Sequence, residues 1–307
     1  MDTMITTESR SLPGRQSRRR SWRFPVGWLY LLPAVIFMGA FTVYPAFNAM
    51  FLSLNTEAPF TGVRHWVGLT NYGDLIRDAD FRGSLVTTLV FTLMTVPMSI
   101  IGGLISALLL NRELPGIAVY RVLLFLPVAV PTATAAIAWR WLYNPAAGYL
   151  NYFLDLLHLG RVAWLQDPSW ALLAVAMAVA WQALGLNAIL MVSGLQAIPE
   201  DLVEAARLDG AGPMQIFWKI TLPLLTPILF FSSIVGVIHA MTTFGPIDLL
   251  TRGGPVNATQ VAVYRIYTEG FINFRFGYAA AQAVVLFLII LVFSVLQNRL
   301  ENRVHYQ

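Results

Sequence analysis

The chain lacks cysteine altogether and has few charged residues. Only 12% of its 307 residues are Asp, Glu, Lys or Arg, whereas a soluble globular domain carries about 25%. Without cysteine, a disulfide framework and a thiolate-ligated metal site are both excluded. The shortage of charge, combined with 57% apolar residues and a mean hydropathy of +0.64, predicts an integral membrane protein.

The chain also lacks the motifs of an ATPase or a hydrolase. Its one lysine, Lys219, follows Trp218 rather than a glycine, so the phosphate-binding loop G-x-x-x-x-G-K-[ST] is missing. There is no Ser/His/Asp arrangement, no H-E-x-x-H motif and no Cys/His metal spacing. We therefore expect no enzymatic activity, no cofactor and no metal site. Any ATP that drives this protein must be bound by another polypeptide.

Long apolar runs make up most of the chain. A helix needs about 20 apolar residues to cross the hydrocarbon core, and six runs reach that length: 26–54, 84–110, 119–143, 169–193, 222–244 and 277–297. The sequence thus predicts an all-α integral membrane protein with six transmembrane helices, in a permease domain over 26–298. Several runs contain proline, which is typical of broken helices that line a pathway. A packing kink is the alternative at each site.

A cluster of arginines before the first run predicts the orientation. Its members are Arg10, Arg15, Arg18, Arg19, Arg20 and Arg23. Nucleic-acid binding is one interpretation, but the apolar run that follows favours a topological role, because positive charge beside a first span holds that end in the cytoplasm. The run exceeds a signal-peptide core of ~7–15 residues. We expect an uncleaved first helix, a cytoplasmic segment over 1–25 and, after six crossings, a cytoplasmic tail over 299–307.

One polar segment, 199–221, interrupts the apolar pattern between the fourth and fifth runs. Pro199-Glu200-Asp201 predicts a helix start, because proline suits the first turn and acidic side chains favour the N-terminal end of the helix dipole. The helix should stop at Gly210, since glycine suits a left-handed C-terminal position. A second short helix should begin at Gly212-Pro213. We expect a helix-turn-helix on the cytoplasmic face of the membrane.

The composition of this segment favours docking of a soluble partner. Small side chains allow close approach of a partner's groove, and Glu204 offers a carboxylate to an Arg. The alternative is an interfacial helix that rests on lipid, but such helices are usually basic, whereas this one is mainly acidic with Arg207 as its one base. We predict a coupling surface made of Glu204, Ala205, Ala206, Asp209, Gly210 and Gly212.

The same segment carries a family resemblance. Glu204-Ala-Ala-Arg-Leu-Asp-Gly210, followed by Ile220-Thr-Leu-Pro223, resembles the coupling motif of the membrane subunit of bacterial ABC importers. Val67-Gly-Leu-Thr-Asn-Tyr72, Tyr143-Asn-Pro145, Leu249-Leu-Thr-Arg-Gly-Gly-Pro255 and Phe276-Gly-Tyr-Ala-Ala-Ala281 are similar to segments of carbohydrate importer permeases. The resemblance implies a type I importer permease with a cytoplasmic coupling helix, located in the bacterial inner (plasma) membrane.

The resemblance also implies partners and a substrate. The partners are a second homologous permease, a dimer of ATP-binding subunits, an extracytoplasmic solute-binding protein and the lipid bilayer, with no nucleic acid. Gly253-Gly-Pro-Val-Asn-Ala-Thr259, Ile266-Tyr-Thr-Glu-Gly-Phe271, Ala281-Gln-Ala-Val-Val285 and Glu301-Asn-Arg-Val-His-Tyr-Gln307 look like the first permease subunit of glycerol-3-phosphate importers. The implied substrate is glycerol-3-phosphate or a glycerophosphodiester. A sugar, amino sugar or oligosaccharide is the alternative.

Polar residues inside the fourth and fifth runs are candidates for the substrate pathway, because transporter sites lie near the midplane on discontinuous helices. The resemblance points to the same two runs. The candidates are Trp181, Gln182, Asn187, His239, Thr242, Thr243 and Phe244. Interhelical hydrogen bonding is the alternative for Gln182, Asn187 and the threonines. His239 can donate to a hydroxyl or, when protonated, attract a phosphate, and a satisfied core histidine is its alternative.

Two other classes of membrane protein fit the sequence less well. An ion-coupled secondary transporter predicts acidic residues inside the spans, and the runs 84–110, 119–143 and 169–193 contain none. A membrane-embedded enzyme needs a catalytic constellation at bilayer depth. His239 is the one histidine within a predicted span, and no catalytic partner is evident for it in the sequence.

Overall fold

The structure is a computed structural model that describes residues 27–57, 63–111 and 115–304. The predicted segment 1–25, the residue Val26 and the last three residues of the predicted tail therefore lie outside the described residues. The chain divides into two compact units, Met1–Phe47 and Asn48–Gln307. Each unit is described by itself.

In the first unit the described chain is a helix with one wide turn. Helix α1 (Gly27–Met38) leads through a π-helical turn, η1 (Gly39–Val43), into α2 (Tyr44–Leu52), which continues into the second unit. The Tyr44 amide donates to the carbonyl oxygen of Gly39, five residues back. Pro45 follows directly, and a proline has no N–H and crowds the preceding turn of a helix. The helical run from Leu29 to Leu52 is apolar and long enough to cross a membrane, as predicted.

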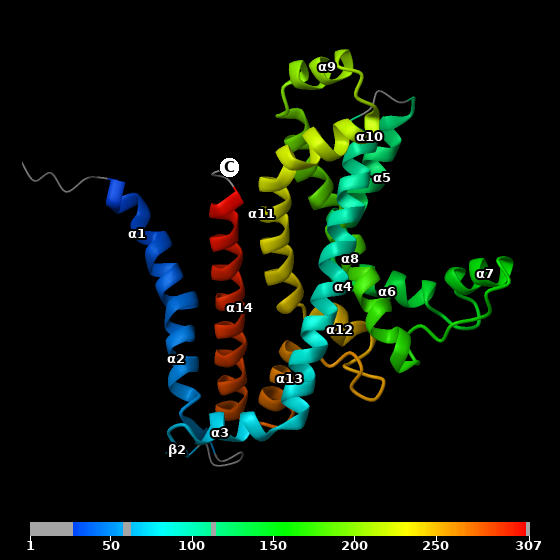
Figure 1. Cartoon of the computed structure of the whole chain (residues 1–307). Helices are drawn as coiled ribbons and strands as arrows, with labels where there is room; N and C mark the ends of the chain where they lie inside the picture. Colours follow the sequence, from blue (N-terminus) through cyan, green and yellow to red (C-terminus); the bar gives the residue numbers. More distant parts are fainter. Residues whose placement is uncertain (1–26, 58–62, 112–114, 305–307) are drawn as a thin grey trace, which may run out of the picture. The chain divides into compact units, whose positions relative to one another are not determined.

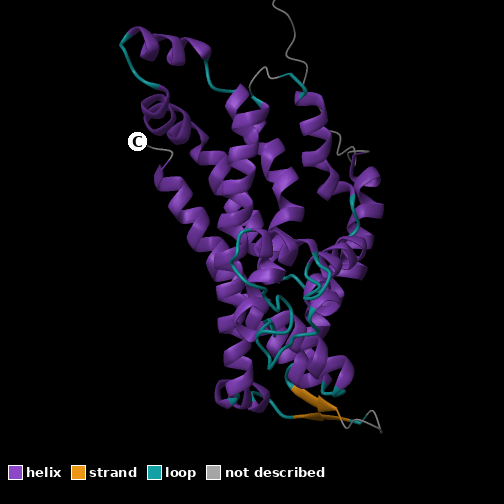
Figure 2. Ribbon diagram, turned by 90° about the vertical axis from the view of Figure 1, so that its right-hand side faces the viewer, coloured by secondary structure: helices purple, strands orange, loops and turns teal. Residues whose placement is uncertain are grey.

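The second unit is helical apart from one short hairpin, in which β1 (Asn55–Glu57) pairs antiparallel with β2 (Arg64–Trp66). Its helical elements are α3 (Thr70–Arg77), α4 (Ala79–Leu110), α5 (Ile117–Ala129), α6 (Thr132–Leu142), α7 (Tyr149–Leu156), α8 (Pro168–Gln196), α9 (Glu200–Leu208), α10 (Pro213–Ile216), η2 (Phe217–Thr221), α11 (Leu222–Met241), α12 (Gly245–Leu250), α13 (Ala262–Tyr267), η3 (Thr268–Ile272) and α14 (Phe276–Val304). Helix α9 lies at one end of this unit, and α3 with the hairpin lies at the opposite end (Figures 1 and 2).

The predicted spans are confirmed with one correction. Five helical runs are long and apolar enough to cross a membrane, and a sixth is reached if α5 and α6 count as one span. These two helices meet at a bend of 110°, so the predicted run 119–143 is not a straight helix. The break falls at Val130-Pro131, because the residue before a proline is driven from helical to extended backbone.

Several helix boundaries also differ from the prediction, most of all in the fifth and the last spans. The fifth span begins earlier and ends earlier, since helical residues run from Pro213 to Met241 instead of 222–244. The last helix continues to Val304, into the segment predicted as a tail. In both places polar residues extend an apolar helix without interrupting it, which hydropathy does not reveal.

The core of the second unit is the seam between α4 and α8, and small side chains form it. A Cβ added to Gly103 would lie 2.6 Å from the Cβ of Asn187. Ala107 on α4 and Ala188 on α8 are fully buried. Because lipid is as apolar as a protein interior, helices in a membrane gain little from burying large apolar groups. They associate through close packing of small residues instead.

Three buried hydroxyl side chains in the first half of α4 form hydrogen bonds with their own helix, whereas the buried Thr95 hydroxyl has no partner among the described residues. Ser84, Thr88 and Thr92 each donate to a carbonyl oxygen of their own helix at 2.7–2.8 Å. The Thr88 hydroxyl also accepts from the Ala262 amide at 2.8 Å, which joins α4 to the start of α13. These bonds let a polar stripe lie buried at little cost.

A cluster of charges ties several elements together at the α3 end of this unit. Asp78 caps α4, with its Oδ1 accepting from the amides of Asp80 and Phe81. Its Oδ2 accepts from Arg265 Nη2 at 2.8 Å and from Tyr278 Oη at 2.6 Å. The Arg265 side chain, only 10% exposed, lies 3.6 Å from a Glu269 oxygen as well. One carboxylate thus joins α4, α13 and α14.

The electrostatics of Asp78 follow from these contacts. Burial raises the pKa of this carboxyl, but hydrogen bonds from Tyr278, the Phe81 amide and Arg265, together with the charge of Arg265, outweigh burial and hold the pKa below its ordinary value. A folded-state pKa below the unfolded value means that the carboxylate contributes stability above the ordinary Asp pKa of about 4. That contribution is lost as the pH falls through the lowered value.

We expect Asp78→Asn to destabilise the fold by about 2 kcal/mol, because it removes charge-assisted hydrogen bonds from a mostly buried Arg265. The measurement is the unfolding midpoint of purified chain in mild detergent at neutral pH. The difference from wild type should shrink as the pH falls below the ordinary Asp pKa of about 4, and it should vanish once the pH is below the lowered folded-state pKa. Asp74→Asn is the control, since Asp74 is exposed and its carboxylate forms no hydrogen bond or ion pair with another described residue. A pH-independent difference would contradict the assignment.

We expect Gly103→Ala to destabilise the chain by about 1–3 kcal/mol, because the added methyl group overpacks the α4–α8 seam against Asn187. Gly83 lies on the same helix with no atom within 4 Å of an added Cβ, so Gly83→Ala is the matched control. That control should be neutral or stabilising by up to about 1 kcal/mol. Thermal unfolding in detergent measures both, and equal midpoints for the two variants would show that the seam does not need glycine.

Candidate functional site

The segment predicted to couple folds as two helical pieces joined by a tight turn. Helix α9 ends with Gly210 in the left-handed conformation, at φ +82°. The Ala211 amide donates to the carbonyl oxygen of Ala206 at 2.9 Å, and the Gly210 amide donates to that of Arg207 at 3.0 Å. This pair of bonds is a Schellman motif. The predicted stop at Gly210 is confirmed, and so is a second helix that begins at Pro213 with Gly212 before it.

Helix α9 forms one wall of a hollow with a volume of about 1270 Å³. Glu200, Val203, Glu204 and Arg207 line it from α9 at helical spacing, and the facing walls come from the ends of α4 and α8 and from α10 and η2. Glu204, which we expected to meet a partner's Arg, therefore lies on the side of α9 that faces the spans. No ion pair joins an α9 side chain to another residue in the described part of the chain.

Two exposed leucines of α9 do not line this hollow, and the sequence analysis left them out of the predicted coupling surface. Leu208 has 89% of its surface exposed, and Leu202 is exposed as well. Ala205 and Asp209, both in the predicted surface, are exposed beside them. Leucines at 202 and 208 within an otherwise polar segment are a signal that could have been read from the sequence. Leu208 is the most exposed leucine among the described residues, so its side chain is available to another molecule.

Helix α9 is connected directly to a membrane span. After Ala211-Gly212 the chain is helical without a gap through α10, η2 and α11. The π-helical turn η2 ends with the Leu222 amide bonded to Phe217, immediately before Pro223. Helix α9 is therefore joined to α11 by the four residues 209–212, the short helix α10 and the wide turn η2.

The fifth predicted span ends before its predicted boundary at residue 244, and a second, short helix follows after a break. Helix α11 ends at Met241, and α12 starts at Gly245. Between them the Thr243 hydroxyl donates to the His239 carbonyl oxygen at 2.8 Å, which satisfies a carbonyl that the ended helix leaves free. The break thus places His239, Thr242, Thr243 and Phe244 at or next to a helix end.

A second helix break adjoins the first. The α5–α6 break leaves the Val130 carbonyl without a helical partner, and Gln182 Nε2 on α8 donates to it at 3.4 Å. The ring of Trp181 meets Trp139 of α6 edge-on, with centroids 5.8 Å apart. A Cβ added to Gly245 would lie 3.6 Å from Thr132 Cγ2, so α12 begins where α6 begins. The two breaks and the Trp181–Gln182 pair are gathered around α6.

The predicted pathway residues divide into three groups. Trp181, Gln182 and Phe244 are half-buried around the breaks. His239 and Thr242 are exposed on the last turn of α11 and on the residue that ends it. Asn187 is buried in the α4–α8 seam against Gly103, and Thr243 is buried with its hydroxyl bonded to backbone. The side chains of the first two groups are partly or fully exposed in this chain, whereas Asn187 and Thr243 pack within the bundle.

Comparison with known sequences agrees with this architecture. Residues 79–306 match the family described as "binding-protein-dependent transport system inner membrane component". The chain belongs to this family, and it is a transport permease by fold. The family region covers every span from α4 to α14 together with the α9 segment.

Individual members of the family are similar to this chain over nearly its whole length. The chain is 37% identical over 283 residues to the sn-glycerol-3-phosphate transport system permease protein UgpA of Agrobacterium fabrum, covering 91% of this chain and 96% of the relative. It is 36% identical over 299 residues to the protein of the same name from Yersinia pestis bv. Antiqua, covering 96% and 99%. The relative of that name from Rhizobium meliloti is 36% identical, covering 91% and 96%.

Solved structures share the fold. A chain from the crystal structure of a bacterial ABC transporter involved in the import of alginate superposes with a TM-score of 0.77 at 22% identity, covering 91% of this chain and 95% of that chain. A chain of the MetNI methionine ABC transporter superposes with a TM-score of 0.53 at 19% identity, covering 73% and 95%. The predicted type I importer permease fold is confirmed.

Proposed function

We propose that the chain is one permease subunit of an ATP-driven, binding-protein-dependent importer of glycerol-3-phosphate or glycerophosphodiesters. In this proposal it pairs with a second homologous permease, a dimer of ATP-binding subunits and an extracytoplasmic solute-binding protein. The single observation that carries the substrate assignment is 36–37% identity, over more than 90% of the chain, to permeases named for sn-glycerol-3-phosphate.

The proposed orientation puts α9 in the cytoplasm, with both termini on the same side. The Arg-rich stretch before the first span supports this orientation through the positive-inside rule. The short acidic helix supports it further, because an exposed leucine and small neighbours suit a protein groove better than an anionic lipid surface. The cell membrane of a bacterium is the proposed location.

In the proposed mechanism the ATP-binding subunits bind α9 through exposed residues that do not line the hollow, which are Leu202, Ala205, Leu208 and Asp209. Closure of these subunits on ATP moves α9, and the continuous helical run from Pro213 carries that movement to the end of α11. His239 and Thr242 lie at that end and would contact the solute. Alternating access results when the two breaks around α6 change shape together.

Glu204 and Gly210 have supporting roles in this proposal. Glu204 lines the hollow behind α9, where a partner's cationic side chain can enter beside it. Gly210 lets α9 end in a tight turn, because a left-handed backbone is unfavourable for other residues. Both contribute to coupling by holding α9 and its turn in place.

We expect Leu208→Ser to weaken association with the ATP-binding subunits by at least about tenfold. Burial of a leucine is worth about 1.5–3 kcal/mol, and 1.4 kcal/mol is a factor of ten. Substrate-dependent uptake should fall in parallel. The unfolding midpoint of the isolated chain should not change, because Leu208 buries almost nothing within the chain itself. Co-purification and uptake in membrane vesicles are the measurements.

The matched control is Leu159→Ser, which alters a leucine 68% exposed in the connection between α7 and α8. It should leave association intact. Glu204→Ala and Gly210→Ala are tested beside Leu208→Ser. The coupling role is wrong if all three retain normal association and normal uptake.

We expect the complete importer in proteoliposomes to take up labelled sn-glycerol-3-phosphate or a glycerophosphodiester only when ATP is supplied on the α9 side of the membrane, where the ATP-binding subunits are proposed to bind. The ATP requirement separates this proposal from an ion-coupled secondary transporter, which would be driven by a proton or sodium gradient alone. Maltose and an amino sugar serve as competing solutes. Uptake of either sugar in place of the phosphate ester would transfer the assignment to the sugar branch of the family.

A further inference from the structure

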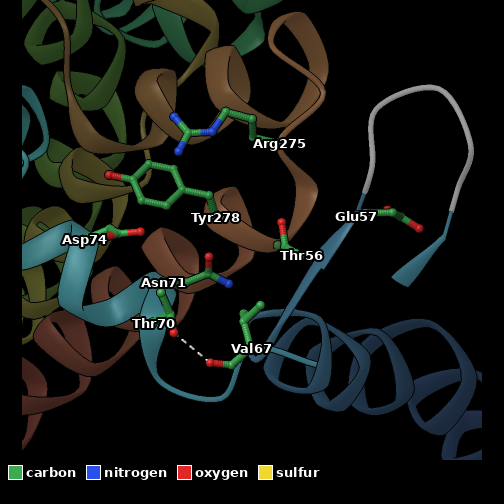
Figure 3. A pocket seen from close by; sticks show the side chains of 9 residues that line it. Thr56, Glu57, Val67, Thr70, Asn71, Asp74, Arg275 and Tyr278 are labelled. Carbon is green, nitrogen blue, oxygen red and sulfur yellow. Dashed lines mark hydrogen bonds between the residues drawn. The ribbon is translucent and has the colours of Figure 1, made fainter. Parts of the chain in front are cut away.

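A small polar pocket lies at the α3 end of the second unit, far from α9. It has a volume of about 280 Å³, which suits a small polar group. Thr56 of β1, Asn71 and Asp74 of α3, and Arg275 and Tyr278 at the start of α14 line it. Figure 3 shows Asp74, Asn71 and Thr56 arranged below Arg275 and Tyr278. The lining thus holds two carboxylates, Asp74 and Glu57, of which Glu57 is paired with Arg64 at 2.9 Å, and one cation, Arg275.

The acceptor on the pocket floor is held in place by buried hydrogen bonds. Asn71 is only 7% exposed, and its amide nitrogen donates to the carbonyl oxygens of Ser53 at 2.8 Å and Asn55 at 3.0 Å. Both N–H groups are used in this way, which fixes the amide and leaves Oδ1 on the pocket side (Figure 3). No described residue donates to Oδ1. Asn71 Oδ1 is therefore an open acceptor on the pocket side, accessible to a hydrogen-bond donor from outside the chain.

The side chains of the pocket favour a positively charged hydrogen-bond donor. The Asp74 carboxylate next to Asn71 Oδ1 favours a positively charged donor, and an ammonium group offers three N–H bonds. On the other side, the guanidinium of Arg275 is held 4.2 Å above the Tyr278 ring and 3.3 Å from a Glu269 oxygen. Its exposed edge remains available to an anion. The pocket thus matches a group that joins an ammonium to an anion.

The position of the pocket indicates where such a group comes from. Arg275 immediately precedes Phe276, the first residue of an apolar span. Phe271 and Phe274 are exposed just before it, as aromatic residues are at a membrane–water interface. The pocket is therefore at the depth where phospholipid headgroups lie.

We propose that this pocket binds a phosphoethanolamine group, with its ammonium on Asp74 and Asn71 Oδ1 and its phosphate on Arg275. The group can belong to a phospholipid of the outer leaflet or to a water-soluble phosphoethanolamine compound. The site is separate from the helix breaks around α6, and it does not depend on which solute the permease imports.

The test compares three lipids that differ only in the headgroup. Full-length chain is titrated with phosphatidylethanolamine, phosphatidylcholine and phosphatidylglycerol, and retained lipid is measured by native mass spectrometry. Choline keeps the charge but has no N–H, and glycerol has no charge at all. Phosphatidylethanolamine should be retained at least about tenfold better than either, since a hydrogen bond to a charged group is worth about 1.5–3 kcal/mol.

Asp74→Asn should remove this preference without changing the fold, because Asp74 is exposed and holds no other described group. Asp80→Asn is the matched control, an exposed acid at the same end that does not line the pocket, and it should keep the preference. A second arm adds soluble phosphoethanolamine or phosphocholine to chain in phosphatidylcholine nanodiscs and measures the melting temperature. A rise with phosphoethanolamine alone supports a soluble source, and lipid selectivity without that rise supports the lipid. Equal retention of all three lipids with no rise overturns the proposal.

Discussion

The close approach of α4 and α8 is the constraint on which the rest of the structure depends. At Gly103 a single methyl group would fill the space between the two helices, so the backbones are as near as side chains permit. Both the α5–α6 break and the charged cluster around Asp78 are attached to the two helices of this seam. Helix α8 supplies Gln182 to the α5–α6 break, and α4 carries Asp78 at its start. A loose seam would move both helix breaks relative to the charged cluster.

Much of this architecture was predictable because membranes restrict the choice of structure. Apolar length identified the spans, and the sequence Leu208-Asp209-Gly210 before Gly212-Pro213 identified the end of α9 and the start of α10. In both cases the local sequence strongly favours a single backbone structure. An apolar run must be helical in lipid, and a helix that ends at glycine takes the left-handed turn.

The remaining features depend on contacts between segments distant in sequence. A proline within an apolar run gives a kink or a complete break, and Pro131 and Pro97 cannot be told apart by local sequence. The first bends α5 from α6 by 110°, whereas the second lies inside continuous α4. Similarly, Asn187 and Gln182 are both polar residues on one apolar helix. Only the position of Gly103 and Val130 shows that Asn187 packs in the seam and Gln182 satisfies a break.

The leucine at the tip of α9 also matters before the subunit meets any partner. With 89% of its surface exposed, Leu208 presents an apolar group to water in any copy that has no partner on α9. In the proposed assembly a partner covers this side chain, so binding and the removal of an apolar group from water are one event.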